Sequence, residues 1–551
     1  MKRKAVAAVL TAVMVASMFT GCGSDNGSSS AKSASAASAA SAANDTVDED
    51  GKVNGIMYQE GLPLVDEGDY TFSIFCDDSS ESGEFIMLDE FKKQTNVDVD
   101  LKIYPYETAT ERLNLDLNSG DYADVIGGWT LSDNAILTYG VNQGVFIPLE
   151  DYFEKYCPNI SAILDLQGVR EKMTAPDGHI YTIPYVCTDT TVGYSPYINT
   201  KWLENVGMSM PTTTDEFEAV LKAFKEQDAN GNGDASDEIP FSTDPNNKHI
   251  EAMAGYFGLP MNKLGIAIQN EKVVYGGVSD TYREFLSWFH KLYAEGLVDV
   301  ELYTQDSSTW EGKGNQDLYG VSIAYGSNEF TGIPAAEERG DFDSMPVLNT
   351  DKDGIWLRDT EGFSVYRTQA VITNKAEHPE IICRWFDNAF ALENGIGCNR
   401  GPVGVIVNKE DDGYHAIDTT TLSEEDQEKY SWGNLWPQSL PKYLPVDFEF
   451  VEEHPMYDEK KATEEAYEAN LTKEIIPSYW IDLDKIDTFS DTNTAIKDFF
   501  EQQQAQFVCG ELDIDNDADW QAYVDGMYSL GLEDWVATQG IEEIDEINRK
   551  R

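Results

Sequence analysis

The chain has 551 residues, too many for a single hydrophobic core and enough for two domains. Hydrophobic residues make up 41% of it and aromatic residues 11%, which excludes a mainly disordered protein. The 39 basic residues stand against 99 acidic ones, a net charge of -60 that argues against nucleic acid and anionic lipid surfaces as partners, because both are bound through Lys and Arg.

The first residues, MKRKAVAAVLTAVMVASMFTGC, predict an export signal. A basic start precedes an apolar run over 5–19 that is too short to span a bilayer comfortably. FTGC at 19–22 resembles a bacterial lipobox, in which cleavage before Cys22 leaves the thiol for lipidation, although Phe19 stands where Leu is usual. We expect a signal peptide over 1–21 and a lipidated Cys22; the alternative is an ordinary signal peptide.

A flexible tether and then a folded part are expected after the signal. Residues 22–48 are rich in Ser and Ala and cannot bury enough apolar surface to fold, so the folded part is expected over 49–551. Six cysteines follow Cys22 without a CxxC pair, which leaves a zinc site unsupported. Disulfides are permitted outside the cytosol, with no connectivity indicated.

The first globular segment alternates strands and helices. TFSIFC (71–76) reads as a buried strand, EFIMLDEFKKQT as a helix and VDVDLKIYPY as a second strand. A helix over ATERLNLDLNSG and a third strand at VIGG follow. This order predicts an α/β fold with a parallel sheet and crossover helices.

The later segments repeat the mixture of strands and helices and end in helices. Helices are expected at TDEFEAVLKAFKEQD, EAMAGYFGLP, TYREFLSWFHKLYAEGLVD and HPEIICRWFDNAFAL, and strands at YGVSIAYG, GFSVYR and AVITN. NTAIKDFFEQQQAQFV and DWQAYVDGMYSLGLEDWVATQ show helical spacing of apolar residues. After the signal, no apolar run is long enough to cross a membrane.

The stretch DANGNGDASDEIP (228–240) predicts a calcium loop. Asp228, Asn230 and Asn232 occupy positions 1, 3 and 5, and a glycine at position 6 allows the sharp turn. The remaining ligands would be the carbonyl of Asp234 and the side chains of Asp237 and Glu238. Position 12, where an EF-hand has Glu, holds Ile, and the alternative is a solvated acidic turn. A strand is expected to follow at EIPFS, so the calcium would be structural.

Several separated segments carry a family resemblance. They are this loop, NTKWLENVGMSMPTTTDEF, GVFIPLEDYFEKYCPNI, APDGHIYTIPY and QFVCGELDIDNDADWQAYVDGMYSLGL. Over residues 65 to 540 the chain resembles the extracellular solute-binding proteins of ABC transporters, and more narrowly their long lipoprotein branch that binds oligosaccharides. The family loop has one residue fewer before its Asp-Glu pair, so Ala235-Ser236 carries an apparent insertion.

The resemblance implies a two-lobed periplasmic-binding-protein-like fold of class II type with hinge crossovers. Lobe 1 is expected over about 65–190 and 360–410, and lobe 2 over about 195–355 and 411–545. The ligand would be trapped between the lobes and delivered to the permease subunits, with calcium bound structurally. We expect a monomer held by its lipid anchor on the extracellular face of the cell membrane.

Carbohydrate recognition suggests where ligand contacts should lie. Sugar rings stack on aromatic side chains, and open α/β sheets bind ligands beyond the carboxyl ends of their strands. By that rule the candidates are Asp77, Asp78, Trp129, Tyr325 and Arg400. Three tryptophans in polar segments, Trp310, Trp432 and Trp436, complete the set, although packing within its own loop is the alternative for each.

An enzyme is the main competing interpretation. The sequence has no GxSxG, HExxH or GxxxxGK[ST], and its six histidines show no metal-ligand spacing. A glycosidase needs only two carboxylates, so a secreted carbohydrate-active hydrolase is the first alternative. An anchored peptide-binding or adhesive protein is the second. We expect a binding protein that is not an enzyme.

Overall fold

The computed structural model describes residues 45–78, 84–166, 168–244, 249–332, 341–417, 419–445, 448, 450–451, 455–476, 480–539, 541 and 543–544. The predicted signal peptide, Cys22 and nearly all of the tether lie outside these residues. Within the described part, no helix has both the length and the apolar composition needed to cross a membrane.

The first of two four-stranded sheets has the order β15-β5-β3-β4. Its strands are β3 (Tyr70–Asp77), β4 (Val97–Tyr104), β5 (Val125–Gly127) and β15 (Ala370–Ile372). β4 and β5 run parallel to β3, and β15 is antiparallel to β5. The strand, helix, strand, helix, strand order predicted from the sequence is therefore confirmed, and β15 is added from a segment 240 residues away.

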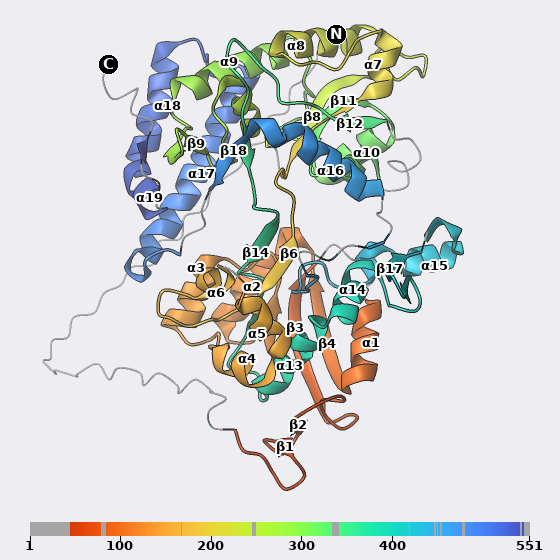
Figure 1. Cartoon of the computed structure of the whole chain (residues 1–551). Coiled ribbons are helices and arrows are strands. Elements are labelled where there is room, and N and C mark those ends of the chain that lie inside the picture. The colour runs from red at the N-terminus through yellow and green to blue at the C-terminus, as the bar shows by residue number, and fades with distance from the viewer. Residues whose placement is uncertain are drawn as a thin grey trace, which may run out of the picture. The chain divides into compact units, whose positions relative to one another are not determined.

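The helices associated with the first sheet come from both halves of the chain (Figure 1). They are α1 (Ile86–Thr95), α2 (Tyr106–Ser119), α3 (Asp133–Ala135), α4 (Glu150–Tyr156), α5 (Pro158–Leu164), α6 (Val169–Met173), α13 (Pro379–Ala389) and α14 (Leu392–Arg400), with a π-helical turn at Ile136–Asn142. Two small hairpins, β1 (Lys52–Val53) with β2 (Met57–Tyr58) and β16 (Val407–Glu410) with β17 (Gly413–Ala416), and α15 (Glu424–Lys429) belong to the same half.

The core of this half is rich in aromatic rings. Phe72 of β3 packs edge-on against Trp385 of α13, with centroids 5.3 Å apart. Trp385 in turn stacks on Trp436 at 5.7 Å, and both tryptophans are fully buried. Leu440 lies in the same core. Trp436 and Leu440 thus contribute to the first core, although the sequence analysis expected lobe 2 to begin at 411.

The second sheet has the order β12-β7-β11-β8. Its strands are β7 (Ser195–Asn199), β8 (Ile239–Thr243), β11 (Tyr319–Ala324) and β12 (Phe342–Ser344). β8 is parallel to β11, whereas β7 is antiparallel to β11 and to β12. The surrounding helices are α7 (Thr200–Val206), α8 (Thr214–Glu226), α9 (Asp280–Ala294), α10 (Ser307–Asn315), α11 (Asn328–Thr331) and α16 (Pro455–Tyr467). The expected helix at EAMAGYFGLP is a 3-10 helix over Ile250–Phe257.

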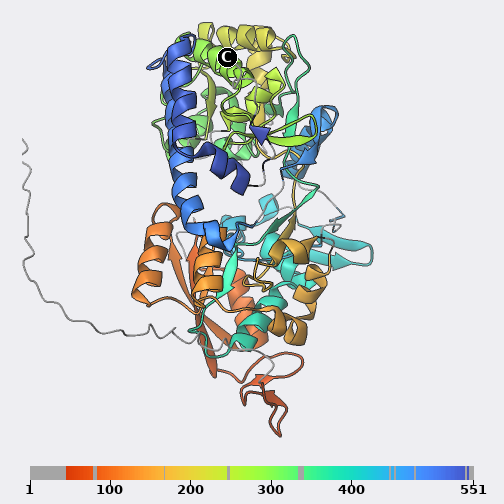
Figure 2. The same ribbon diagram turned by 90° about the vertical axis from the view of Figure 1, so that its left-hand side faces the viewer.

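The C-terminal helices pack on the second half, as expected (Figure 2). They are α17 (Ile486–Cys509), α18 (Asp517–Ser529) and α19 (Leu532–Thr538). Phe500 of α17 stacks on Tyr282 of α9 at 5.5 Å, and the Gln504 side chain donates to the Tyr282 hydroxyl at 3.0 Å. Small pairings complete this half: β9 (Ile266–Gln269) with β10 (Lys272–Tyr275), β19 (Glu543–Ile544) with β10, and β13 (Trp356–Arg358) with β18 (Leu471–Ile475).

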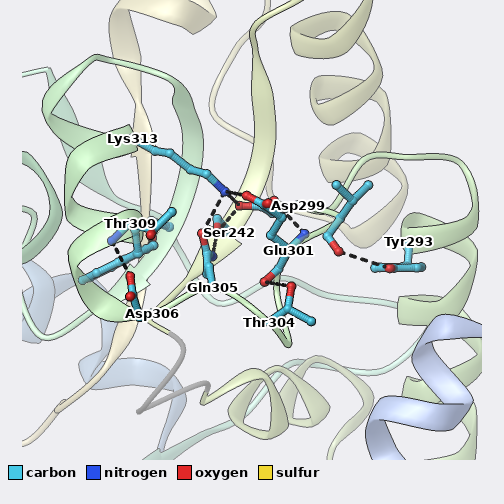
Figure 3. A network of polar contacts seen from close by, with 12 residues as sticks. Ser242, Tyr293, Asp299, Glu301, Thr304, Gln305, Asp306, Thr309 and Lys313 are labelled. Carbon is cyan, nitrogen blue, oxygen red and sulfur yellow. Dashed lines mark hydrogen bonds and ion pairs between the residues drawn. The ribbon is translucent and has the colours of Figure 1, made fainter. Parts of the chain in front are cut away.

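An ion pair between a partly buried lysine and a buried aspartate holds α10 against the second sheet (Figure 3). Lys313 of α10 contacts Asp299 at 2.9 Å and the Gln305 side chain at 2.8 Å, and Ser242 of β8 also donates to Asp299. Burial alone would lower the pKa of Lys313, but its bonds to Glu301 and Asp299 raise it, so the ammonium stays charged. The charged groups of this network bind one another and neighbouring side chains, so we assign the network a role in stability.

Two strands connect the two halves. β6 (Tyr185–Thr188) leads from the first half into β7, and β14 (Phe363–Tyr366) leads back from β13 to β15. They pair antiparallel with Val186 opposite Val365 (Figure 1). Further along, the Trp480 indole donates to the carbonyl of Lys172 at 3.1 Å, so a C-terminal segment also contacts the first half.

Candidate ligand-binding site and calcium loop

An aromatic and polar cluster surrounds the crossing strands β6 and β14. Trp129 follows β5, is 45% exposed, and meets the ring of Tyr366 edge-on at 5.3 Å. Tyr366 lies 5.5 Å from the ring of Tyr185, its partner across the two strands. Three aromatic rings, one from the loop after β5 and one each from β6 and β14, thus gather beside one another.

The carboxylate of Asp189, just after β6, links these strands to the second sheet. Its Oδ2 accepts from the hydroxyls of Ser364 at 2.5 Å and Tyr366 at 3.3 Å. Its Oδ1 accepts from the hydroxyl of Tyr325, which follows β11, at 3.2 Å. Asp189 therefore links Tyr325 to Tyr366, the ring that meets Trp129, although Tyr325 and Trp129 lie far apart in the sequence.

Lys460 of α16 completes the surroundings of Tyr325. Its Nζ lies 3.7 Å from the centre of the Tyr325 ring and donates to the carbonyl of Gly193 at 2.9 Å. Burial lowers the pKa of Lys460 to about 8. The Tyr325 amide donates to Glu329 at 2.9 Å, and the ring of Tyr194 stands edge-on at 6.1 Å. The phenol is thus fixed from three sides.

Asp77 is buried and holds the loop that carries Trp129. Its carboxylate accepts from the amides of Trp129 at 2.9 Å and Thr130 at 2.6 Å. Gly128 has φ of +131°, and a Cβ there would collide with this carboxylate. Asp77 therefore positions the loop that carries Trp129, and a direct contact with ligand, expected from its place after β3, stays a prediction.

A second group lies at the same end of β3. Asp78 is buried and accepts from the amide of Gln438 at 2.7 Å, so it too is occupied within the protein. The Gln438 side chain accepts from Lys442 at 2.5 Å, and the Lys442 ammonium lies 5.2 Å from the ring of Trp432. Trp432 is 53% exposed, so it remains a candidate stacking surface.

The other expected ligand contacts, Trp310, Trp436 and Arg400, lie in different surroundings. Trp310 is 2% exposed and its indole donates to Ser322 in the second core, and Trp436 is fully buried against Trp385. Protein side chains cover both rings, so neither is available for stacking on a sugar. Arg400 is half-buried, with its guanidinium 5.8 Å from the Phe450 ring, and burial lowers its pKa to about 10.

Sequence reasoning missed Asp189, Tyr366 and Lys460. Asp189 directly follows a strand, so the rule that selected Trp129 could have found it. Tyr366 lies on a crossing strand, whose role depends on a partner 180 residues away. No sequence pattern around Lys460 indicates its role, because its contact with Tyr325 joins residues that are distant in the sequence.

In the predicted calcium loop, each of two carboxylates has one oxygen that accepts a hydrogen bond and one oxygen that does not. Asp228 Oδ2 accepts from the amide of Gly233 at 3.0 Å, and Glu238 Oε1 from the amide of Ala229 at 2.8 Å. The second oxygen of each carboxylate is buried without a hydrogen-bond partner. Burial raises the pKa of Glu238, as expected for a carboxylate whose charge nothing balances. Two buried carboxylate oxygens without hydrogen-bond donors fit the binding of a cation.

The other four groups of the loop lie around these carboxylates. The amides of Asn230 and Asn232 donate to Asp237 at 3.2 and 2.7 Å. The Asp234 side chain is exposed and accepts from the Ser236 hydroxyl at 2.6 Å, which leaves its carbonyl as the group expected to face an ion. β8 begins directly after the loop at Ile239, as predicted.

Comparisons with known proteins place the chain in a class. Residues 78–395 match the bacterial extracellular solute-binding protein family. The fructooligosaccharide ABC transporter substrate-binding protein FusA of Streptococcus pneumoniae serotype 4 is 31% identical over 411 residues, covering 72% of this chain and 70% of FusA. Lipoprotein LipO of Bacillus subtilis is 28% identical over 49% of this chain and 52% of LipO.

Solved structures agree with this class. FusA in complex with kestose superposes with a TM-score of 0.75 at 26% identity, covering 85% of this chain and 98% of that one. An EF-hand mutant of FusA with fructo-nystose gives 0.72 at 27% identity, with the same coverage. The expected two-lobed α/β fold of solute-binding proteins is thus confirmed. The chain belongs to the family of bacterial extracellular solute-binding proteins, a family of binding proteins associated with ABC importers.

Proposed function

We infer that this protein captures an oligosaccharide outside the cell and delivers it to the permease of an ABC importer. The observation that carries the proposal is the cluster around β6 and β14, where a half-exposed Trp129 stands near Asp189 and Tyr325. Rings offer stacking surfaces to the apolar faces of sugars, and carboxylates and phenols bind their hydroxyls. FusA, which shares the fold and 31% of aligned residues, binds fructooligosaccharide.

The charges at the cluster favour a neutral sugar. Asp189 and Glu329 both place carboxylates within hydrogen-bond distance of Tyr325. The nearby cation, Lys460, is covered by the Tyr325 ring and bound to a backbone carbonyl. Hydroxyls can donate to these carboxylates, whereas the carboxylate of an acidic sugar would be repelled by them. We therefore propose fructan-type or other neutral oligosaccharides over uronates.

The proposed domain arrangement follows the packing. Lobe 1 comprises the residues of the first core, including 435–443, and lobe 2 those of the second core and the C-terminal helices. On this proposal the chain would cross to lobe 2 after residue 443. Export, lipidation of Cys22 and a tether would hold a monomer on the outer face of the membrane, close to the permease.

Calcium is proposed as a structural ion in the loop at 228–239. Asp228, Asn230, Asn232 and Asp237 would supply side-chain oxygens, with the Asp234 carbonyl and Glu238 completing the shell. The ion would satisfy the two unpartnered oxygens of Asp228 and Glu238 and brace the connection between α8 and β8.

A glycan panel tests the function. Kestose, nystose, neutral plant oligosaccharides and oligogalacturonides are titrated calorimetrically, and each mixture is assayed for new reducing ends or released monosaccharide. We expect saturable binding of a neutral oligosaccharide with no product. Steady product formation would support the hydrolase alternative, and binding of peptides without any glycan would support the adhesive one.

A further inference from the structure

The β16–β17 hairpin places three possible metal ligands on one side of a tight turn. Asn408 pairs with His415, and Glu410 pairs with Gly413. Alternate residues of a strand, and residues paired across two strands, share a face of the sheet. Glu410 and His415 are therefore diagonal neighbours on one face, and the glycine opposite Glu410 adds no side chain between them.

Asp412, in the turn, completes the group. The Nε2 of His415 lies 3.0 Å from Oδ1 of Asp412. One ligand atom from each of Glu410, Asp412 and His415 falls within 4.8 Å of the other two. No other trio of His, Cys, Asp or Glu reaches this arrangement in the part of the chain that the structure describes. The His415 side chain is only 15% exposed, so its ring is already held in place.

The geometry points to a binding site for a divalent transition-metal ion, of the zinc type, formed by Glu410, Asp412 and His415. Bonds of about 2.1 Å put two ligand atoms of one ion at most about 4.2 Å apart, so small side-chain rotations complete the site. One imidazole nitrogen with two carboxylates suits zinc, cobalt or nickel, whereas calcium prefers oxygen alone. Three protein ligands leave a position for water, and the net charge of -60 favours cations near the surface.

The ion would stabilise a hairpin that holds one of the connections between the two halves. The amide of Val451 donates to the carbonyl of Tyr414, next to His415, at 3.0 Å. The ring of Phe448 lies 5.7 Å from that of Tyr414. Residues 448 and 451 belong to the segment that leads into α16. A metal ion that fixes β17 would therefore also fix the start of this connection.

The test uses the full, tag-free chain, stripped with chelator and then saturated with calcium so that the 228–239 loop is filled. Zinc chloride is titrated calorimetrically, and cobalt binding is followed by its visible absorption. We expect one saturable site for each metal. H415A should lower the zinc affinity at least about tenfold, since removing even an outer partner of a metal ligand costs that much. D412N should act in the same direction.

A matched control is available at His179, which pairs with Glu150 at 2.5 Å but belongs to no such trio. H179A should leave zinc binding unchanged. Melting temperatures in chelator show whether each variant folds; if H415A does not, D412N decides, because the Asp412 side chain is 68% exposed. Absence of saturable zinc binding to the wild type, or equal affinity in wild type and the folded hairpin variants, would overturn the proposal.

Discussion

Trp129 and Trp436 allow the ligand site to be separated from the core by a pair of matched substitutions. Trp129 is 45% exposed and touches Tyr366 edge-on, whereas Trp436 is fully buried and stacks on Trp385. An aromatic pair of the first kind contributes about 0.5 to 1.5 kcal/mol, so Trp129→Ala should cost about 1 kcal/mol of unfolding free energy. Trp436→Ala removes a whole core side chain and should cost about 3 to 5 kcal/mol.

For glycan affinity we expect the reverse: Trp129→Ala should have the larger effect and Trp436→Ala the smaller one. If a sugar ring stacks on Trp129, truncation should weaken binding of the best glycan at least tenfold, or about 1.4 kcal/mol. Trp436→Ala, where it folds, should bind within about twofold of the wild type, because its ring faces Phe91 and Trp385 and no open surface. Denaturant unfolding gives the stabilities and calorimetry the affinities.

Two results would contradict the role of Trp129 as a stacking surface for the sugar. A Trp129→Ala protein that is strongly destabilised and yet binds normally when folded would place this ring in the core. A Trp129→Ala protein with normal stability and normal affinity would move the ligand site away from the end of β5.

Two further predictions concern the calcium loop and a buried lysine. Chelator should lower the melting temperature of the wild type but not of Asp228→Ala, since an ion bound only to the folded state stabilises it. Asp234→Ala, which removes a side chain the ion does not need, should keep this sensitivity; no bound calcium in purified wild type would contradict the loop assignment. Burial lowers the pKa of Lys442 from 10.5 to about 8. The unfolded state then binds more protons at this side chain between pH 8 and 10.5, so Lys442 should add up to about 3 kcal/mol of stability as the pH rises there, measured by denaturant unfolding. Lys442→Met should remove this part of the rise and leave the part due to Lys460, whose pKa is also lowered to about 8. An identical pH dependence in both proteins would show that Lys442 does not cause it.

The strands and long helices could be predicted because their signals are local. β3, β4 and β5 carry continuous apolar runs, and α9 and α17 carry apolar residues at helical spacing. The same local rule, that ligand contacts follow strand ends, selected Trp129 and Tyr325, which the structure brings near the crossing strands; their contact with a ligand stays a prediction. It did not indicate that Asp77 holds the loop of Trp129, since the rule cannot say whether a carboxylate at a strand end faces solvent or binds the next loop.

The buried tryptophans could not be predicted, because burial depends on partners that are distant in sequence. Trp436 lies in a polar segment, and its partners, Phe91 and Trp385, come from α1 and α13. Nothing in the residues around 436 indicates them. For the same reason the sequence could not indicate that Trp436 and Leu440, beyond the expected end of lobe 1, pack in the first core.

The cluster at β6 and β14 connects binding with the arrangement of the two halves. Trp129 follows a strand of the first sheet and Tyr325 a strand of the second; Asp189 accepts from the hydroxyls of Tyr325 and Tyr366, and the Tyr366 ring meets Trp129. A ligand can shift a conformational equilibrium only by binding one state more tightly than the other. A sugar that touched Trp129 and Tyr325 together would bind only where the two halves bring them close. Its affinity would then itself favour that arrangement, which is what delivery of a trapped ligand to a permease requires.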